Sequence, residues 1–204
     1  MLKRERKGFL VRLAVIISLI LSFFMFFPKE SLGKVGSFKT YHFGEYGWRV
    51  ELDSGWDRMS VPNKEVVSVA VDSKVLIKFK HTNVGVRVVV FVKNKVVKNW
   101  SKNQIVKAVE YYVKNTRMVK RGQTFSLKTF LGESLSSFGR SYDAIDILMG
   151  TEYWSRVGKF VSFSHQGRDF AFFVYVHDEM RNYDFETLSM VIKREILNGM
   201  NFVE

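Results

Sequence analysis

The chain has 204 residues and carries 32 lysines and arginines against 20 aspartates and glutamates, a net charge of +12. It contains no cysteine, which excludes a lipidated cysteine anchor, a disulfide framework and thiolate ligands for zinc. Only two prolines interrupt it and 15% of its residues are aromatic. A folded part of about 170 residues therefore has enough apolar side chains for one compact domain.

The chain begins with a basic stretch, residues 1–8, followed by an apolar segment at 9–27, FLVRLAVIISLILSFFMFF. A helix of this length extends roughly 28 Å, close to the hydrocarbon thickness of about 30 Å, provided that Arg12 reaches the lipid headgroups. Basic residues flanking a span stay in the cytoplasm. We therefore predict a signal anchor, a transmembrane helix that crosses the cell membrane once, with a cytoplasmic tail and an extracytoplasmic domain.

A cleaved signal peptide is the alternative to the anchor. Such a peptide has the same basic start and apolar run, followed by small residues at the cleavage site. Ser31 and Gly33 supply small residues, so cleavage near Gly33 would release a secreted domain. The bulky phenylalanines that end the apolar segment favour the anchor. The polar residues 28–39 are predicted to be a linker and residues 40–204 the extracytoplasmic domain.

Alternating apolar residues predict four strands in the first half of the domain, at 48–53, 65–71, 75–80 and 86–93. The last two are expected to pair as an antiparallel hairpin, with Lys78 opposite Arg87 or Val89. This register brings one set of apolar side chains onto a common face. The set comprises Val75, Ile77, Phe79, Val86, Val88, Val90 and Val92.

The opposite face of this hairpin is predicted to be basic. Its side chains are Lys78, Lys80, Arg87 and Lys93. They belong to a stretch, residues 74–121, in which Glu110 is the only acid. We predict that this face, with an exposed Trp100, contacts lipid headgroups, an anionic envelope polymer or an acidic protein partner. Nucleic acid is not an expected partner outside the cytoplasm, and solvated lysines that keep the sheet soluble are the alternative interpretation.

Two helices are predicted in the domain. Residues 101–104, SKNQ, form a capping box, and apolar residues at helical spacing continue this helix to about Thr116. Asp184 is the expected N-cap of a second helix at 185–198, which Gly199 would end as its C′ residue.

Four further strand-like runs lie between the helices, at 124–131, 138–149, 159–165 and 169–178. The serine-rich residues 132–137 are expected to form a loop, and Gln166-Gly167 a two-residue turn. The run at 169–178 is apolar on both faces, which indicates a central strand. This order predicts an α+β fold: one mostly antiparallel, twisted sheet of about six to seven strands with two main helices packed on it.

Two short pieces resemble the PsbP-like domain, a family named for the extrinsic P subunit of the photosystem II oxygen-evolving complex. Residues 46–50, YGWRV, with the Ser-Gly-Trp of residues 54–56 resemble the family's opening strand and turn, although its proline is absent here. Residues 196–202, ILNGMNF, resemble the end of its last helix, with Gly199 in place of serine. The resemblance covers residues 41–204. It implies the family's fold and its docking to larger assemblies, and it implies no catalytic residue.

Candidate catalytic and metal-binding groups are dispersed in the sequence. The four histidines are His42, His81, His165 and His177. His165 would lie at a hairpin tip and His177 beside Arg156, on the order of 30 Å away, so those two cannot share a metal. Asp143 and Asp146 fall on opposite faces of a strand, and Glu133 would reach Asp146 only through a tertiary contact.

No nucleophile motif and no glycine-rich phosphate loop is present. We therefore expect no cofactor, no metal and no enzyme activity, and we interpret the protein as a membrane-tethered binding or assembly module. The alternative is an envelope enzyme or a small-molecule binding protein with an aromatic-lined pocket. A third possibility is a subunit whose span pairs through a stripe of small residues, Ala14, Ser18 and Ser22.

Overall fold

The structure is a computed structural model that describes residues 37–61, 66–67, 73–93, 100–116, 118–177 and 183–203. The chain divides into two compact units, Met1–Ser37 and Phe38–Glu204. The predicted tail at 1–8, the apolar segment at 9–27 and the linker up to residue 36 lie outside the described residues. Within the described part, none of the helices has the length and apolar character needed to cross a membrane.

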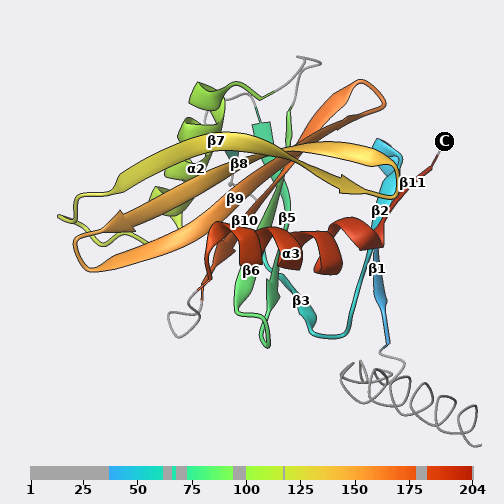
Figure 1. The fold of residues 1–204 in the computed structure, drawn as a ribbon, viewed down its shortest axis with the longest axis horizontal. Helices are drawn as coiled ribbons and strands as arrows, with labels where there is room; N and C mark the ends of the chain where they lie inside the picture. The colour runs from blue at the N-terminus through green and yellow to red at the C-terminus, as the bar shows by residue number, and fades with distance from the viewer. Residues whose placement is uncertain are drawn as a thin grey trace, which may run out of the picture. The chain divides into compact units, whose positions relative to one another are not determined.

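Eight antiparallel strands form a large sheet (Figure 1). In sheet order these are β3 (Trp56–Met59), β5 (Ser73–His81), β6 (Val86–Lys93), β10 (Arg168–Val176), β9 (Trp154–His165), β8 (Arg140–Thr151) and β7 (Ser126–Ser137), with β4 (Val66–Val67) paired to β5 off this path. After Arg168, every residue of β10 is buried. This confirms the prediction that the run at 169–178 is a central strand covered on both sides.

A second, three-stranded sheet has the order β1-β2-β11. Its strands are β1 (Lys39–Phe43), β2 (Trp48–Leu52) and β11 (Met200–Phe202), and a short 3-10 turn, η1 (Gly44–Tyr46), joins the first two. The α+β class, the antiparallel pairing and the two main helices are thus confirmed. The prediction of a single sheet of six to seven strands is wrong, because β1 and β11 both pair with β2 and form a second sheet with it.

The first main helix is α2 (Lys102–Asn115), and its start follows the predicted capping box. The Gln104 backbone N–H donates to the Ser101 hydroxyl at 3.3 Å, and the Ser101 backbone N–H donates to the Gln104 side chain at 3.0 Å. Five residues at helical spacing are buried against the sheet: Ile105, Ala108, Val109, Tyr112 and Val113. The capped helix with one apolar stripe is therefore confirmed.

The second main helix, α3 (Phe185–Glu195), also begins as predicted, with Asp184 accepting a hydrogen bond from the Thr187 backbone N–H at 2.7 Å. It ends earlier than predicted, and a 3-10 turn, η2 (Leu197–Gly199), follows it. The expected C′ role of Gly199 is therefore wrong. A Cβ at this position would lie 2.0 Å from the Glu51 carbonyl oxygen, so the close approach of β2 requires glycine here.

The large sheet has a separate hydrophobic core on each face. On one face, Trp48 of the small sheet and Leu188 of α3 share a core with Phe172. On the other face, Val109 of α2 shares a core with Phe173. Figure 1 shows α2 and α3 on opposite sides of the large sheet. The domain thus has three layers, and from Phe170 to Val176 the residues of β10 belong alternately to one core and the other.

The β5–β6 hairpin has the predicted antiparallel register, with Lys78 opposite Val89. Six of the seven residues predicted to share a face do so: Ile77, Phe79, Val86, Val88, Val90 and Val92 all belong to the α3-side core. Val75 belongs to the α2-side core, contrary to the prediction. The register shifts between Val75 and Ile77, and such an irregularity reverses the side-chain direction of the residues before it.

Two hairpins close through residues in the left-handed region of backbone conformation. In the predicted Gln166-Gly167 turn, φ is 48° and 73°, which is typical of a tight two-residue turn and confirms the prediction. The Phe138-Gly139 turn has nearly the same φ values, 47° and 74°, and joins β7 to β8. The predicted loop at 132–137 is therefore wrong, because β7 continues through these serines to Ser137.

Candidate functional site

The basic sheet face predicted to contact a partner is largely covered by α2. Lys78 is 6% exposed and Lys93 is 2% exposed, whereas Lys80 remains exposed and Arg87 is half-buried. Trp100 is 8% exposed, so the prediction of an exposed tryptophan is wrong. Val89 and Phe91 lie on this same face and pack against the helix, which explains why its lysines are buried with them.

Lys93 and Trp100 are instead part of the attachment of α2 to the sheet. The Lys93 ammonium lies 3.6 Å from the Asp169 carboxylate and 5.1 Å from the centre of the Trp100 ring. It also donates to the Gln104 side chain at 3.3 Å. Gln104 belongs to the capping box, so one buried cation connects the start of α2 to the sheet.

The exposed positive charge of this region lies on the outer side of α2 and on the loop that follows it. Lys102, Lys107 and Lys114 are exposed on the helix, and we call this surface the basic face of α2. Glu110 is the one acid in α2 and is half-buried. Lys107 and Lys114 are two helical turns apart, so their side chains share one side of the helix.

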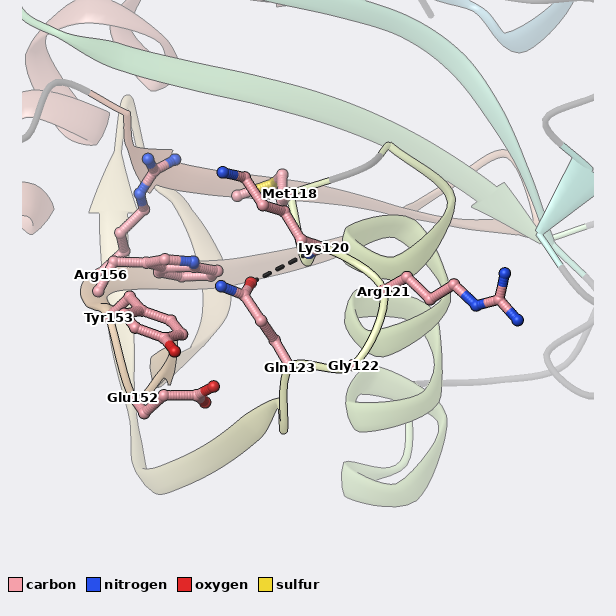
Figure 2. Close-up of a pocket in the computed structure, with 9 residues that line it drawn as sticks. Met118, Lys120, Arg121, Gly122, Gln123, Glu152, Tyr153 and Arg156 are labelled. Carbon is pink, nitrogen blue, oxygen red and sulfur yellow. Dashed lines mark hydrogen bonds between the residues drawn. The ribbon is translucent and has the colours of Figure 1, made fainter.

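Beyond α2 lies a hollow of about 710 Å³ between the loop at 118–123 and the turn that joins β8 to β9 (Figure 2). We call it the basic hollow. It is lined by Met118, Lys120, Arg121, Gly122, Gln123, Glu152, Tyr153, Trp154 and Arg156. Three of these residues are cations and one is a carboxylate, so the lining favours an anionic ligand.

Arg156 is held in place on two sides. Its guanidinium lies 5.0 Å from the centre of the Trp154 ring, a favourable cation–π distance. Its Nη1 lies 3.2 Å from the His177 Nδ1, and because a guanidinium only donates, the histidine nitrogen accepts. The prediction that His177 lies beside Arg156 is thus confirmed.

The opposite wall is a short loop closed by its own hydrogen bonds. The Gln123 backbone N–H donates to the Lys120 carbonyl at 3.1 Å, and the Lys120 backbone N–H donates to the Gln123 Oε1 at 3.0 Å. In Figure 2 the Lys120 side chain extends to the same side of the hollow as Arg156, whereas Arg121 points away. Lys120 and Arg156 are therefore the cations that a ligand in the hollow would meet.

The sequence places Lys120 and Arg121 in the basic stretch at residues 74–121 but does not single out this hollow. Its other wall comes from residues about 30 positions later. The signal that was available is the Tyr-Trp-Ser-Arg stretch of residues 153–156, which begins in the turn after β8. The pairing of β7 with β8, which sets Ser126 opposite Gly150, brings this stretch beside the loop at 118–123.

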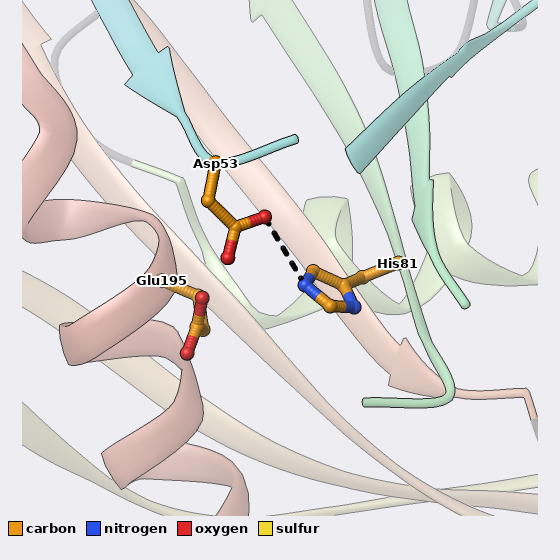
Figure 3. A group of neighbouring side chains, drawn as sticks. All are labelled: Asp53, His81 and Glu195. Atoms are coloured by element: carbon orange, nitrogen blue, oxygen red, sulfur yellow. Dashed lines mark ion pairs between the residues drawn. The ribbon is translucent and has the colours of Figure 1, made fainter. Parts of the chain in front are cut away.

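A second cluster consists of Asp53, His81 and Glu195, whose ligand-type atoms lie within 4.8 Å of one another (Figure 3). The backbone N–H of Val84 donates to His81 Nδ1 at 3.1 Å, so the neutral ring carries its hydrogen on Nε2. That nitrogen lies 3.3 Å from the Asp53 carboxylate. Neither ring nitrogen then offers a lone pair to a metal or a substrate proton, and the arrangement fits a structural link better than a metal centre or a general base.

A third cluster surrounds Lys159, which is fully buried. Its ammonium pairs with the Asp146 carboxylate at 2.7 Å and with the Glu133 carboxylate. The Ser189 hydroxyl of α3 donates to Glu133 at 2.7 Å. The hydrogen bond from Lys159 is the largest cause of a lowered pKa at Glu133. The tertiary contact that would bring Glu133 to Asp146 therefore exists, through a lysine that sequence reasoning had not considered.

No protein-family model and no curated protein matches the chain. Its structure is similar to the solution structure of cyanobacterial PsbP (CyanoP) from Synechocystis sp. PCC 6803, with a TM-score of 0.51 and 11% identity over 86% of this chain and 98% of that chain. The Saccharomyces cerevisiae Ran-binding protein Mog1p gives a TM-score of 0.46 and 8% identity over 83% of this chain and 97% of that one. The domain therefore has a PsbP-like fold, as its sequence resemblance implied, and identities this low show the fold alone.

Proposed function

We propose that this protein is a membrane-tethered, extracytoplasmic binding module without catalytic activity. Its anionic partner would contact the basic face of α2 and the adjoining basic hollow. The observation that carries the proposal is the exposure of Lys102, Lys107 and Lys114 on a helix with a single, half-buried acid. Exposed cations of one sign attract an anionic surface and speed its encounter with the protein.

The chemistry of the two side-chain clusters supports a binding role. His81 uses both ring nitrogens within the protein, and Lys159 is engaged by two carboxylates. A general base or a nucleophilic lysine needs a free lone pair directed at a substrate. These groups are therefore used to hold elements of the fold together.

Charge reversal on α2 tests the proposed contact surface. The full-length protein, kept in detergent, is bound to immobilised polyglutamate and eluted with salt. We expect Lys107→Glu with Lys114→Glu to elute at clearly lower salt than the unmodified protein, because electrostatic binding between exposed charges is screened by ions. Glu110→Gln removes the acid of the helix and is expected to elute later.

The matched control is Lys193→Glu with Arg194→Glu on α3. These two residues are exposed, and their reversal changes the net charge by the same amount on the opposite side of the large sheet. The proposal requires the α2 variant to lose much more retention than the α3 variant. Equal losses would mean that net charge, and not the face of α2, determines binding.

The membrane tether rests on the apolar segment at 9–27 and on the basic residues before it. Intact-mass measurement of the protein extracted from its own membranes is expected to give the full-length chain. A chain that starts near Lys34 would contradict the anchor and support cleavage of a signal peptide.

A further inference from the structure

We propose that the basic hollow binds an acidic sugar, a saccharide ring that carries a carboxylate or a phosphate. This inference rests on the proposed function, since it names the chemical class of ligand at one part of the same basic surface. It is carried by the combination of cations, an exposed aromatic ring and a carboxylate around one hollow of about 710 Å³.

The charged groups of the hollow are separated. Figure 2 shows Lys120 and Arg156 toward one end and the Glu152 carboxylate toward the other. The cations suit the acid group of a ligand, because ammonium and guanidinium groups donate charge-assisted hydrogen bonds to carboxylates and phosphates. A carboxylate at the other end accepts hydrogen bonds and would repel a second anionic group. The ligand is therefore acidic at one end and a hydrogen-bond donor, such as a hydroxyl group, at the other.

The aromatic residues of the hollow supply a flat apolar surface between these ends. The Tyr153 side chain is 75% exposed, so its ring plays no part in the core and is open to a ligand. Trp154 is half-buried and is backed by the Phe125 ring at 6.4 Å. A sugar ring combines an apolar face of C–H groups with hydroxyls at its edge, so it can cover an aromatic surface while its polar groups reach the walls.

The loop wall adds a donor for such hydroxyls or for a ring oxygen. The Gln123 Oε1 already accepts from the Lys120 backbone N–H, which fixes the orientation of the amide. Its nitrogen is thereby directed to the side of the hollow on which Tyr153 lies (Figure 2). An amide N–H and a carboxylate together match the alternating donor and acceptor character of hydroxyl groups.

A bare inorganic anion does not explain the site equally well. The hollow falls within the size range of small-molecule sites, about 300–1,000 Å³, which is more space than a single anion needs. Neither the exposed Tyr153 nor Glu152 would favour an anion with no ring and no hydroxyl. The acidic sugar uses all four kinds of group that line the hollow.

The test compares four probes on the full-length protein in detergent by isothermal titration calorimetry. The probes are galacturonate oligomers, neutral galactose oligomers, galactose 1-phosphate and inorganic phosphate. We expect one of the two acidic sugars to bind about tenfold more tightly than both the neutral oligomers and inorganic phosphate. Which of the two binds distinguishes a carboxylate from a phosphate as the recognised acid.

Two variants assign the binding to this hollow. Tyr153→Ala removes an exposed ring that the core does not need, and we expect it to weaken acidic-sugar binding about tenfold. Phe138→Ala is the matched control, because Phe138 is 80% exposed at a different hairpin turn. The control variant should bind like the unmodified protein.

The possible failures are distinguishable. If acidic sugars bind no better than phosphate, or if Tyr153→Ala binds them normally, the acidic-sugar site is refuted, whereas the proposed function stands as long as Lys107→Glu with Lys114→Glu weakens polyanion retention. If the α2 variant also retains full binding to polyglutamate, the proposed function fails as well.

Discussion

Lys93 on the α2 face of the large sheet and Lys159 on the α3 face are both buried, and their ion pairs differ. On the α2 face, Lys93 and Asp169 form one pair, with side chains 2% and 6% exposed. On the α3 face, Lys159 meets two carboxylates, and the side chains of Asp146 and Glu133 are 18% and 47% exposed. The first pair is closed off from water on both sides, whereas the second is open on its acidic side.

The difference predicts how firmly each helix is attached. Lys93 contacts the capping box of α2 through Gln104, so the charge pair and the start of the helix depend on each other. Among the described residues, Lys159 reaches α3 through Glu133, which accepts a hydrogen bond from Ser189. A closed pair is costly to break because a buried charge loses its partner, while an open one can exchange its partner for water. The helix that carries the proposed binding face is thus the more firmly fixed one.

The largest effect is expected from breaking the closed pair. Asp169→Ala leaves the Lys93 ammonium buried near Trp100, and we expect it to lower the free energy of unfolding by about 3–5 kcal/mol. Urea denaturation measures the loss. The double variant with Lys93→Met should recover much of it, since it removes the unpaired charge, and a double variant less stable than Asp169→Ala would contradict this account.

A smaller effect is expected on the other face. Lys159→Met removes the cation but leaves Glu133 able to turn toward solvent, so we expect a loss of about 2 kcal/mol, below the range for a fully enclosed pair. The same denaturation experiment checks it. A loss equal to or greater than that of Asp169→Ala would show that exposure of Glu133 to solvent does not reduce the cost of removing the Lys159 charge.

The smallest effect concerns pH. The pKa of Glu133 lies below its ordinary value of 4.5, chiefly because Lys159 donates a hydrogen bond to it. A carboxyl with a lowered folded-state pKa stabilises the protein above its unfolded pKa, and this contribution is lost as the pH falls through the folded value. Because solvent screens this partly exposed carboxylate, Glu133 contributes about a few tenths of a kcal/mol to the free energy of unfolding.

Glu133→Gln tests this directly. Its urea midpoint is expected to lie slightly below that of the unmodified protein at pH 7, and the difference should shrink as the pH falls below about 4.5. The comparison is repeated in the Lys159→Met background, where the pH dependence of the difference should become smaller because the largest cause of the lowered pKa is removed. A difference that persists unchanged at low pH would mean that Glu133 acts through packing and not through its charge.

Local patterns in the sequence predicted local structure well. The capping box at 101–104 starts α2, Asp184 starts α3, and Gln166-Gly167 closes the β9–β10 hairpin. Each of these signals depends on residues that are close together in the sequence. The loop predicted at 132–137 was wrong because serines and a glycine suit loops in isolation, whereas pairing with β8 holds them in a strand.

Predictions that depended on what covers a surface were less accurate. Strand alternation correctly placed Lys78 and Lys93 on the opposite face from Val88 and Val90. It did not reveal that α2 packs on that face, because the alternation of residues within one hairpin carries no information about where a later helix packs. The basic hollow and the Lys159 cluster were missed for the same reason, since each joins segments that only the tertiary fold brings together.

The contacts of the Gly47 carbonyl indicate the order in which the strands of the small sheet come together during folding. It accepts the Val203 backbone N–H at 2.8 Å and the His165 Nε2 at 2.9 Å, and nearby Val50 of β2 pairs with Met200 of β11. Contacts between residues so far apart in the sequence form slowly, because the entropy cost of closing a long loop comes before the stabilisation by the new hydrogen bonds. Strand β2, which contains the apolar Trp48, cannot complete its pairing until β11 has been synthesised. The pairing of β11 with β2 is therefore expected to be the last part of the small sheet to form and the first to open when the C-terminal strand is pulled away.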